Sequence, residues 1–297
     1  MPRRSVVQMG TIVTVDVVGA IDDDADCDAR MTRALGWFEV VERACSRFDP
    51  ASELRQLGAV PGTAVAVGPI LFEAVQFAIA VAHESGGAFD PTIGAAMDVR
   101  GFDRDYRSGD RTGSGVADLP TVSYRDVEID CDARTITLRA PLVLDLGAVA
   151  KGLAIDMAAR ELAPLRHFMI DAGGDLYAGG CNARGKPWSI GIRHPRRDGE
   201  WIETVTASDC AVCTSGDYER ASANGHHLID PVTREPAAAL ASATVIAPTA
   251  MVADALATAA FVLGPEEGLR LLERQRVEGL LLTAELDRHA TRGFGRV

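Results

Sequence analysis

Lysine is nearly absent from this chain of 297 residues: Lys151 and Lys186 are the only two, and arginine supplies the remaining basic groups. Positive charge is also scarce overall, because 42 acidic residues outnumber 30 basic ones and give a formal net charge of −12. A surface this acidic does not attract nucleic acid or an anionic membrane. We therefore expect no nucleic-acid partner, and each lysine becomes worth examining.

Long apolar runs are lacking as well. No stretch approaches the ~18 apolar residues that a membrane-spanning helix needs, so no membrane span is predicted. Residues 1–10 do not contain the apolar core of a signal peptide. These two absences lead us to expect a cytoplasmic protein.

The six cysteines lack the regular spacing of a secreted disulfide scaffold. Cys210 and Cys213 form a lone C-x-x-C motif, and no second pair completes a zinc site. The motif lies in an apolar run. Both cysteines are therefore predicted to be buried strand residues rather than redox or metal-binding groups.

Helical and strand patterns are intermixed along the chain without a strict β–α–β rhythm. Helices are predicted after the acidic residues 22–26, at 69–83, from the glycine turn after residue 145 to about residue 162, at about 250–263 and at 266–274. Strands are predicted at 11–17, 142–145, 168–170, 188–192, 243–247 and 280–283, with a hairpin over 127–138 and a mobile loop over 103–118. This order predicts an α+β fold with mixed or antiparallel sheets and packed helices. Because no repeat or linker is visible, one domain is predicted over residues 1–297.

A first segment with chemical potential covers residues 144–152, where a strand end, a glycine turn and a helix start follow one another. Backbone N–H groups at a helix start favour phosphate, and Lys151 would add a point charge there. The glycine spacing fits neither a P-loop nor a dinucleotide-binding fingerprint. In the alternative reading, Asp145 is simply a hydrogen-bonded residue at the strand end.

A second segment places Asp171 and Asp175 on either side of the pair Gly173 and Gly174. Glycines allow a ligand to approach the backbone closely. Taken alone, however, this segment favours a tight turn between two strands.

A third region, residues 214–220 and 226–231, is dense in titratable groups. His226 and His227 are adjacent, so on a strand only one of them can face a given pocket. A histidine can remove a hydroxyl proton near neutral pH. A purely structural histidine remains the alternative.

A fourth pattern joins Asp254 and Thr258, which are four residues apart and share one face of an otherwise apolar helix. A buried carboxylate needs a partner, and Mg²⁺, which prefers oxygen ligands, is one candidate. Alternatively, Thr258 bonds its own backbone and Asp254 pairs with an arginine. Two loop aromatics, Phe48 and Phe89, could stack on a heterocycle or plug the core.

In this order, the segments resemble the FAD:protein FMN transferases, formerly grouped as thiamine-biosynthesis lipoproteins. The resemblance runs from residue 9 to residue 264, and its most specific parts are residues 87–92, 145–152, 215–220, 227–231 and 253–258. It implies an enzyme that moves FMN from FAD to a Ser or Thr hydroxyl of an acceptor flavoprotein and releases AMP. It also implies Mg²⁺ as a cofactor.

The resemblance implies a role for individual residues. FAD would be contacted by Met9, Phe48, Ala88, Phe89, Asp90, Asp145, Lys151 and Leu228, with the first two flanking the adenine. Mg²⁺ would be held by Asp254, Thr258 and the backbone carbonyl of Ala148. His227 would assist the acceptor hydroxyl, and His227 and Asp254 would be the catalytic residues.

Two positions depart from the family pattern: Gly58 stands where an asparagine is usual, and Arg234 where a glycine is usual. The first removes an amide from the adenine side, and the second requires an altered turn or a strained arginine. Two other functions stay open. A FAD pyrophosphatase would use water as the acceptor, and a non-catalytic flavin-binding protein would not need the pair Asp254 and Thr258.

Overall fold

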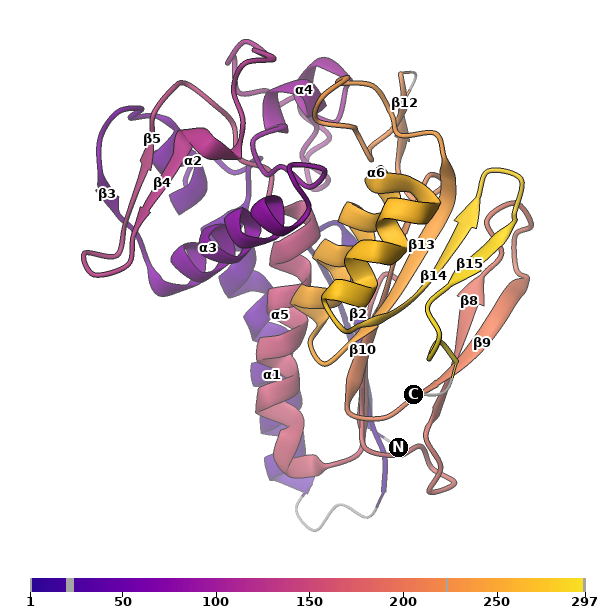
Figure 1. Cartoon of the computed structure of the whole chain (residues 1–297). Coiled ribbons are helices and arrows are strands. Elements are labelled where there is room, and N and C mark those ends of the chain that lie inside the picture. The colour runs from indigo at the N-terminus through magenta and orange to yellow at the C-terminus, as the bar shows by residue number, and fades with distance from the viewer. Residues whose placement is uncertain (1, 20–23, 223, 296–297) are drawn as a thin grey trace.

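The computed structural model describes residues 2–19, 24–222 and 224–295. Its centre is an eight-stranded sheet in which every pair of neighbouring strands is antiparallel (Figure 1). In order across the sheet, the strands are β1 (Arg3–Gln8), β2 (Thr11–Val17), β6 (Phe168–Ala172), β7 (Asp175–Gly179), β10 (Cys210–Gly216), β13 (Leu240–Ala247), β14 (Glu278–Thr283) and β15 (Arg288–Ala290). The α+β class with antiparallel sheets is thereby confirmed.

Helices cover one face of this sheet (Figure 1). The helices are α1 (Asp24–Cys45), α2 (Glu53–Gly58), α3 (Pro69–Glu84), α4 (Gly94–Val99), α5 (Gly147–Leu162) and α6 (Ala250–Arg274), and those that contact this face are α1, α5 and α6. The pair α5 and α6 packs together on the sheet, and α1 packs against α5. In the described part of the chain, no helix combines the length and the apolar character needed to cross a membrane.

Three smaller strand groups complete the fold. A three-stranded sheet contains β3 (Val65–Ala66), β5 (Thr135–Leu138) and β4 (Val127–Asp130), and two ribbons pair β8 (Trp188–Arg193) with β9 (Trp201–Ala207) and β11 (Ala221–Ser222) with β12 (Gly225–His226). Side chains of β8 and β9 form a second apolar cluster with residues of β7, β10, β13 and β14. The main sheet is thus covered by helices on one face and by this ribbon on the other.

Strand β10 shows how the two cores share one element. Cys213 belongs to the core under the helices, whereas Cys210 belongs to the cluster under the ribbon. Residues three apart on a strand point to opposite faces. The prediction of two buried strand cysteines is confirmed, and the two sulfurs cannot share a metal.

Most predicted elements are present, including the hairpin over 127–138. The strand predicted at 142–145 is wrong: these residues are largely buried, but they form only an isolated bridge between Ile93 and Val143. An apolar run reports burial, and here it has no neighbouring strand with which to form a ladder. Of the acidic run 22–26, residues 22 and 23 lie outside the described residues, while Asp24 and Asp26 lie in the first turn of α1, where carboxylates are favourable.

The two helices predicted after residue 250 form one element, α6, with a break inside it. Gly264 has a non-helical backbone (φ 79°, ψ −175°), and Pro265 follows it. The first half of α6 carries Asp254 and Thr258, so the break separates the part that reaches the site from the part that packs on β14.

Candidate active site

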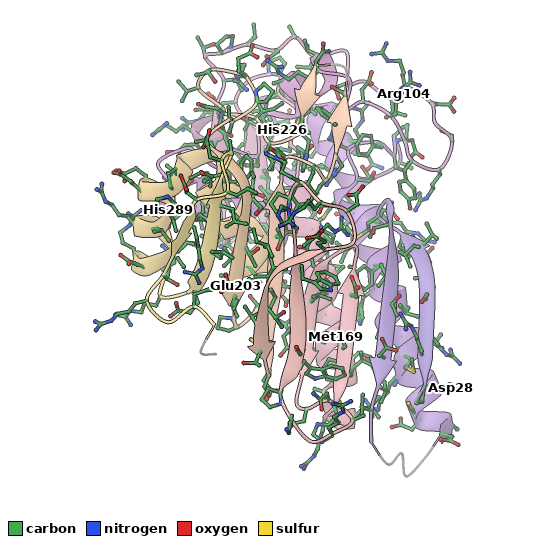
Figure 2. The ribbon with its side chains drawn as sticks, turned by 90° about the vertical axis from the view of Figure 1, so that its right-hand side faces the viewer. Asp28, Arg104, Met169, Glu203, His226 and His289 are labelled. Atoms are coloured by element: carbon green, nitrogen blue, oxygen red, sulfur yellow. The ribbon has the colours of Figure 1, made fainter. Side chains whose placement is uncertain are left out.

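A cavity of about 520 Å³ lies at one end of the main sheet. Figure 2 shows this end by the labels of His226 and Arg104, while Asp28 and Met169 mark the other end. Every residue that the sequence analysis predicts for FAD, Mg²⁺ or catalysis lines this cavity: Met9, Phe48, Ala88, Phe89, Asp90, Asp145, Ala148, Lys151, His227, Leu228, Asp254 and Thr258. The fold therefore gathers segments from nearly the whole chain at one place, and the volume is typical of a ligand pocket.

The turn between β1 and β2 brings Met9 to the cavity. Met9 and Gly10 both have left-handed backbones (φ 51° and 74°), which suits a two-residue hairpin turn and is rare for a methionine. The N–H of Met9 donates to the Glu42 carboxylate at 3.4 Å, and the Tyr106 hydroxyl donates to the same carboxylate at 3.3 Å. Glu42, which is buried on α1, therefore fixes the backbone of Met9 and the side chain of Tyr106 at the cavity wall.

The two loop aromatics differ in burial. Phe89 is only 5% exposed and belongs to the main core, so core packing accounts for much of its role. Phe48 is half-buried, and the guanidinium of Arg47 lies over its ring at 4.3 Å from the centroid. Phe48 therefore keeps surface that a heterocycle could stack on, whereas Phe89 contributes mainly to the wall.

Asp90 is buried and uses both carboxylate oxygens to fix its own loop. One oxygen accepts from the N–H and the hydroxyl of Thr92 at 2.8 and 2.7 Å, and the other accepts from the N–H of Tyr124 at 3.0 Å. Burial raises the pKa of Asp90, against the effect of these hydrogen bonds. Its predicted contact with FAD remains a prediction; its contribution to loop geometry is direct.

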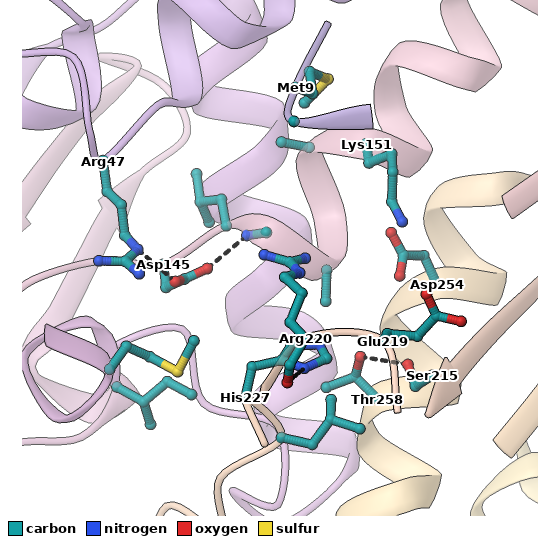
Figure 3. A pocket seen from close by; sticks show the side chains of 18 of the residues that line it. Met9, Arg47, Asp145, Lys151, Ser215, Glu219, Arg220, His227, Asp254 and Thr258 are labelled. Atoms are coloured by element: carbon teal, nitrogen blue, oxygen red, sulfur yellow. Dashed lines mark hydrogen bonds and ion pairs between the residues drawn. The ribbon is translucent and has the colours of Figure 1, made fainter. Parts of the chain in front are cut away.

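Asp145 is fully paired. Its Oδ1 accepts from the N–H of Gly147 at 2.7 Å, and its Oδ2 lies 2.7 Å from Nε of Arg47 (Figure 3). Arg47 also reaches Asp98 at 2.6 Å and the carbonyl of Phe102. Burial acts to raise the pKa of Asp145, but the Arg47 charge and the hydrogen bonds outweigh it and lower this pKa. Sequence reasoning missed Arg47, whose only hint was its place beside Phe48.

Lys151 forms an ion pair with Asp175. Burial acts to lower the pKa of Lys151, but the negative charges of Asp175 and Asp254 outweigh it and raise this pKa. Asp175 is 2% exposed, and its Oδ1 also accepts from the N–H of Thr214 at 3.2 Å. Lys151 is therefore a fixed positive charge at the cavity wall.

The tight turn predicted at residues 171–175 is confirmed. Gly173 and Gly174 have φ of 71° and 97° and link β6 to β7. The turn places Asp175 at the first position of β7, where it meets Lys151. Asp175 was not predicted as a site residue, because nothing in its own segment shows which helix it faces.

Asp254 carries the unusual carboxylate of the site. It is 6% exposed, and its Oδ2 is buried without a hydrogen-bond partner among the described residues. Burial, followed by the nearby negative charge of Asp175, raises the pKa of Asp254 to about 7, although Lys151, Arg220 and the N–H of Gly152 act in the opposite direction. A buried carboxylate with an oxygen left unpaired is costly and indicates a function.

Two residues of α5 place α6, and so Asp254, at this position. A Cβ at Gly152 would lie 2.5 Å from Cα of Met251, so only glycine permits the close approach of the two helices. One turn later, the buried carboxylate of Asp156 accepts from the N–H groups of Ala250 and Met251 at 2.7 and 3.0 Å and caps the start of α6. Burial raises the pKa of Asp156 to about 6.

The donor set around Asp254 fits a magnesium ion. Thr258 lies one turn further along α6, and its hydroxyl is 3.0 Å from that of Ser215. Within the described part of the chain, Thr258 therefore does not bond its own backbone, and Asp254 does not pair with an arginine. The backbone N–H of Gly152 acts to lower the pKa of Asp254, so the first turns of α5, which also carry Ala148, lie beside this carboxylate. Among the described residues, no three His, Cys, Asp or Glu side chains cluster around a metal position. Mg²⁺ suits such a set, because it needs few protein ligands and keeps waters.

Of the two adjacent histidines, His227 lines the cavity and His226 does not. His226 is held by the Leu228 N–H at Nδ1 (3.2 Å) and by the Ala237 carbonyl at Nε2 (2.9 Å). Nδ1 of His227 lies 3.3 Å from the carbonyl of Arg220 (Figure 3). A carbonyl only accepts, so Nδ1 carries the proton and Nε2 keeps a lone pair.

The environment keeps His227 neutral. Burial, together with the positive charge of Arg220, lowers the pKa of His227 to about 3. An imidazole that stays unprotonated near neutral pH retains its Nε2 lone pair for accepting a proton.

The two departures from the family pattern have different outcomes. Arg234 adopts a left-handed backbone (φ 60°), so it tolerates the position expected for glycine. Its guanidinium donates to the carbonyls of Leu119 and Val122 at 3.3 and 3.1 Å and so ties down the 118–122 segment. Gly58 ends α2 and is not among the residues that line the cavity.

Comparison with known proteins agrees with this geometry. The model of the ApbE family matches residues 9–281. The FAD:protein FMN transferase of Treponema pallidum is 33% identical over 91% of this chain and 80% of its own length, and that of Klebsiella pneumoniae is 28% identical over 93% and 83%.

Solved structures show the same fold over the whole chain. The ApbE protein of Thermotoga maritima superposes with a TM-score of 0.86 at 28% identity, covering 99% of this chain and 97% of its own. The flavin transferase ApbE of Vibrio cholerae gives 0.85 at 26% identity, with the same coverage. The family match and the shared fold both extend through the cavity-lining segments, and this chain belongs to the ApbE family.

Proposed function

We propose that this protein transfers FMN from FAD to a Ser or Thr hydroxyl of an acceptor flavoprotein and releases AMP, with Mg²⁺ as cofactor. The observation that carries the proposal is the meeting, in one cavity, of Lys151, His227 and a buried Asp254 with an unpaired oxygen. The relatives named FAD:protein FMN transferase support the transfer of FMN from FAD to a protein.

The reaction breaks the bond between the FMN phosphorus and the oxygen that bridges it to AMP. It forms a bond from the acceptor hydroxyl oxygen to that phosphorus, and the electrons of the broken bond leave with AMP. Phosphoryl transfer of this kind depends on positioning and on positive charge around the phosphate oxygens. Lys151 and the N–H groups at the start of α5 supply part of that charge.

Mg²⁺, held by Asp254, Thr258 and the carbonyl of Ala148, would neutralise charge on the pyrophosphate. The residues of the chain do the rest. Nε2 of His227 accepts the hydroxyl proton, since Nδ1 already donates to the Arg220 carbonyl. Met9 and Phe48 hold the adenine side, and the loop from Ala88 to Asp90 shapes the wall.

The experiment measures AMP and free FMN released from FAD with Mg²⁺, with and without a Ser/Thr acceptor peptide, and the intact mass of the peptide. AMP without matching free FMN, together with a peptide heavier by one FMN, is the expected result. Equal amounts of AMP and FMN with an unmodified peptide would instead establish a FAD pyrophosphatase. FAD recovered intact on the protein would overturn the proposal in favour of a flavin-binding protein.

A further inference from the structure

Four basic side chains line the described cavity: Arg47, Arg104, Lys151 and Arg220. A dinucleotide pyrophosphate needs at least one cation free to bind it, because its two phosphates are both ionised at neutral pH. Which of the four is free is decided by their existing partners.

Three of the four are already bonded within the protein. Arg47 is 7% exposed and is held by two carboxylates and a carbonyl, as described above. Lys151 pairs with Asp175, and Arg104 donates from Nη1 to the carbonyl of Gly109 at 2.9 Å. Breaking the Arg47 or Lys151 contacts would leave buried carboxylates unpaired.

The side chain of Arg220 differs from these three. In the described part of the chain, its guanidinium has neither a hydrogen-bond partner nor an ion-pair partner, although its backbone carbonyl binds His227. The side chain is exposed, and it reaches into the cavity between Asp145 and Asp254 (Figure 3). All five of its N–H donors are available to a ligand.

The position of Arg220 is central to the chemistry. Its charge acts on Asp145, Lys151, His227 and Asp254, so the guanidinium lies near the base, the fixed lysine and the carboxylate proposed for the metal. It stands on the segment after β10, and its own carbonyl orients the imidazole of His227. Arg220 thus orients the base through its backbone carbonyl, while its side chain lies near Lys151 and Asp254.

We infer that Arg220 is a further catalytic residue, whose guanidinium binds the pyrophosphate of FAD and stabilises the charge that develops on the bridging oxygen as AMP leaves. The inference rests on the proposed function. A planar guanidinium suits this task because it can contact two phosphate oxygens at once, which a lysine cannot do. The bonds made and broken are those given above, and Arg220 neither gains nor loses a proton.

The test compares Arg220→Gln and Arg220→Lys with the native protein. Both changes leave the backbone carbonyl that orients His227 in place. For AMP release from FAD, we expect kcat/KM to fall by about 100- to 1000-fold in Arg220→Gln, as for removal of a charge-stabilising donor elsewhere. Arg220→Lys should lose about 10-fold, because it keeps the charge but not the fork. Arg193→Gln, which removes a nearby exposed arginine 3.7 Å from Glu219, should stay within about twofold.

A binding measurement separates this role from a structural one. Titration of the Mg²⁺-free protein with ADP and with adenosine measures the pyrophosphate contribution apart from catalysis. Arg220→Gln should weaken ADP binding by about 10-fold and leave adenosine binding unchanged. Millimolar guanidinium should restore part of the activity of Arg220→Ala, which a merely structural arginine would not allow.

The outcomes distinguish the inference from the proposed function. Native activity and native ADP affinity in Arg220→Gln would overturn the inference and leave the transferase proposal intact. Equal weakening of ADP and adenosine would also overturn it, because it would indicate a disturbed cavity rather than a lost phosphate contact. If the native protein fails to transfer FMN, the ADP and adenosine titrations still decide whether Arg220 binds the pyrophosphate.

Discussion

Asp145 and Asp254 are both largely buried carboxylates that line the same cavity, yet they are paired in opposite ways (Figure 3). Asp145 is held by the Arg47 guanidinium and a backbone N–H, and its pKa is lowered. Asp254 has an oxygen with no partner among the described residues, and its pKa is raised to about 7. Both oxygens of Asp145 have partners within the protein, whereas Oδ2 of Asp254 would gain a partner only from a bound ligand such as a cation.

The difference in pairing predicts which carboxylate contributes mainly to the stability of the fold and which contributes mainly to activity. A paired buried carboxylate contributes to the folded state, and removal of its partner is strongly destabilising. An unpaired one destabilises the folded state and persists only where it has a use. We therefore expect substitutions on the Asp145 side to change stability first, and those on the Asp254 side to change activity first.

The largest effect is expected for Asp254→Ala. It removes the carboxylate proposed for Mg²⁺, so AMP release from FAD should fall by more than about 1000-fold. The measurement is AMP release at saturating FAD across a magnesium series. Asp217→Asn is the control, because Asp217 pairs with Arg196 at 2.7 Å and does not line the cavity. Near-normal turnover of Asp254→Ala at cellular magnesium would contradict the metal assignment.

Arg47→Ala should have the largest effect on stability. It leaves the largely buried Asp145 and Asp98 without their shared cation, so the free energy of unfolding should fall by about 3–5 kcal/mol. Denaturant unfolding followed by circular dichroism measures this. Arg43→Ala, which removes an exposed arginine one turn before it, should change the free energy of unfolding by less than about 0.5 kcal/mol. Equal changes in the free energy of unfolding for the two variants would show that the buried ion pairs of Arg47 stabilise the fold no more than an exposed one does.

His227→Gln should slow FMN transfer by about 100-fold, as expected for the loss of a general base. Because the pKa of His227 is lowered to about 3, its protonation should not limit the reaction near neutral pH. Because protons and Mg²⁺ compete for Asp254, whose pKa without metal is raised to about 7, activity at limiting Mg²⁺ should fall as the pH drops below 7, and this limb should survive in His227→Gln. Loss of that limb in the variant would assign it to the histidine. His289→Gln, outside the cavity, should behave as the native protein does.

The smallest effect is a gain in stability. The pKa of Asp254 is raised from 3.8 to about 7, so folding favours its neutral form, and the metal-free protein loses stability as the pH rises from 4 to 7. At pH 8, Asp254→Asn should therefore raise the free energy of unfolding by roughly 1–3 kcal/mol. Part of the gain is offset because Lys151 loses the favourable negative charge of Asp254. At pH 4 the two proteins should unfold alike. Added Mg²⁺ should stabilise only the native protein, and an equal response of the variant would refute the assignment.

The sequence determined much of this protein through local rules. The spacing of Asp254 and Thr258 on one helix face, the glycine turn before β7 and the α+β class all follow from periodicity and turn chemistry. The family resemblance located the predicted site residues in separate segments, and all of them line one cavity in the structure. The failure at 142–145 shows the limit of such rules, since an apolar run indicates burial but not a strand partner.

Only the tertiary structure decided which groups meet. Arg47 and Asp98 are 51 residues apart, and no local pattern predicts their contact. The pairing of Lys151 with Asp175 and the capping of α6 by Asp156 likewise depend on how α5, α6 and the sheet pack. Charges act through space rather than along the chain, so only packing determines which carboxylate is paired and which remains unpaired.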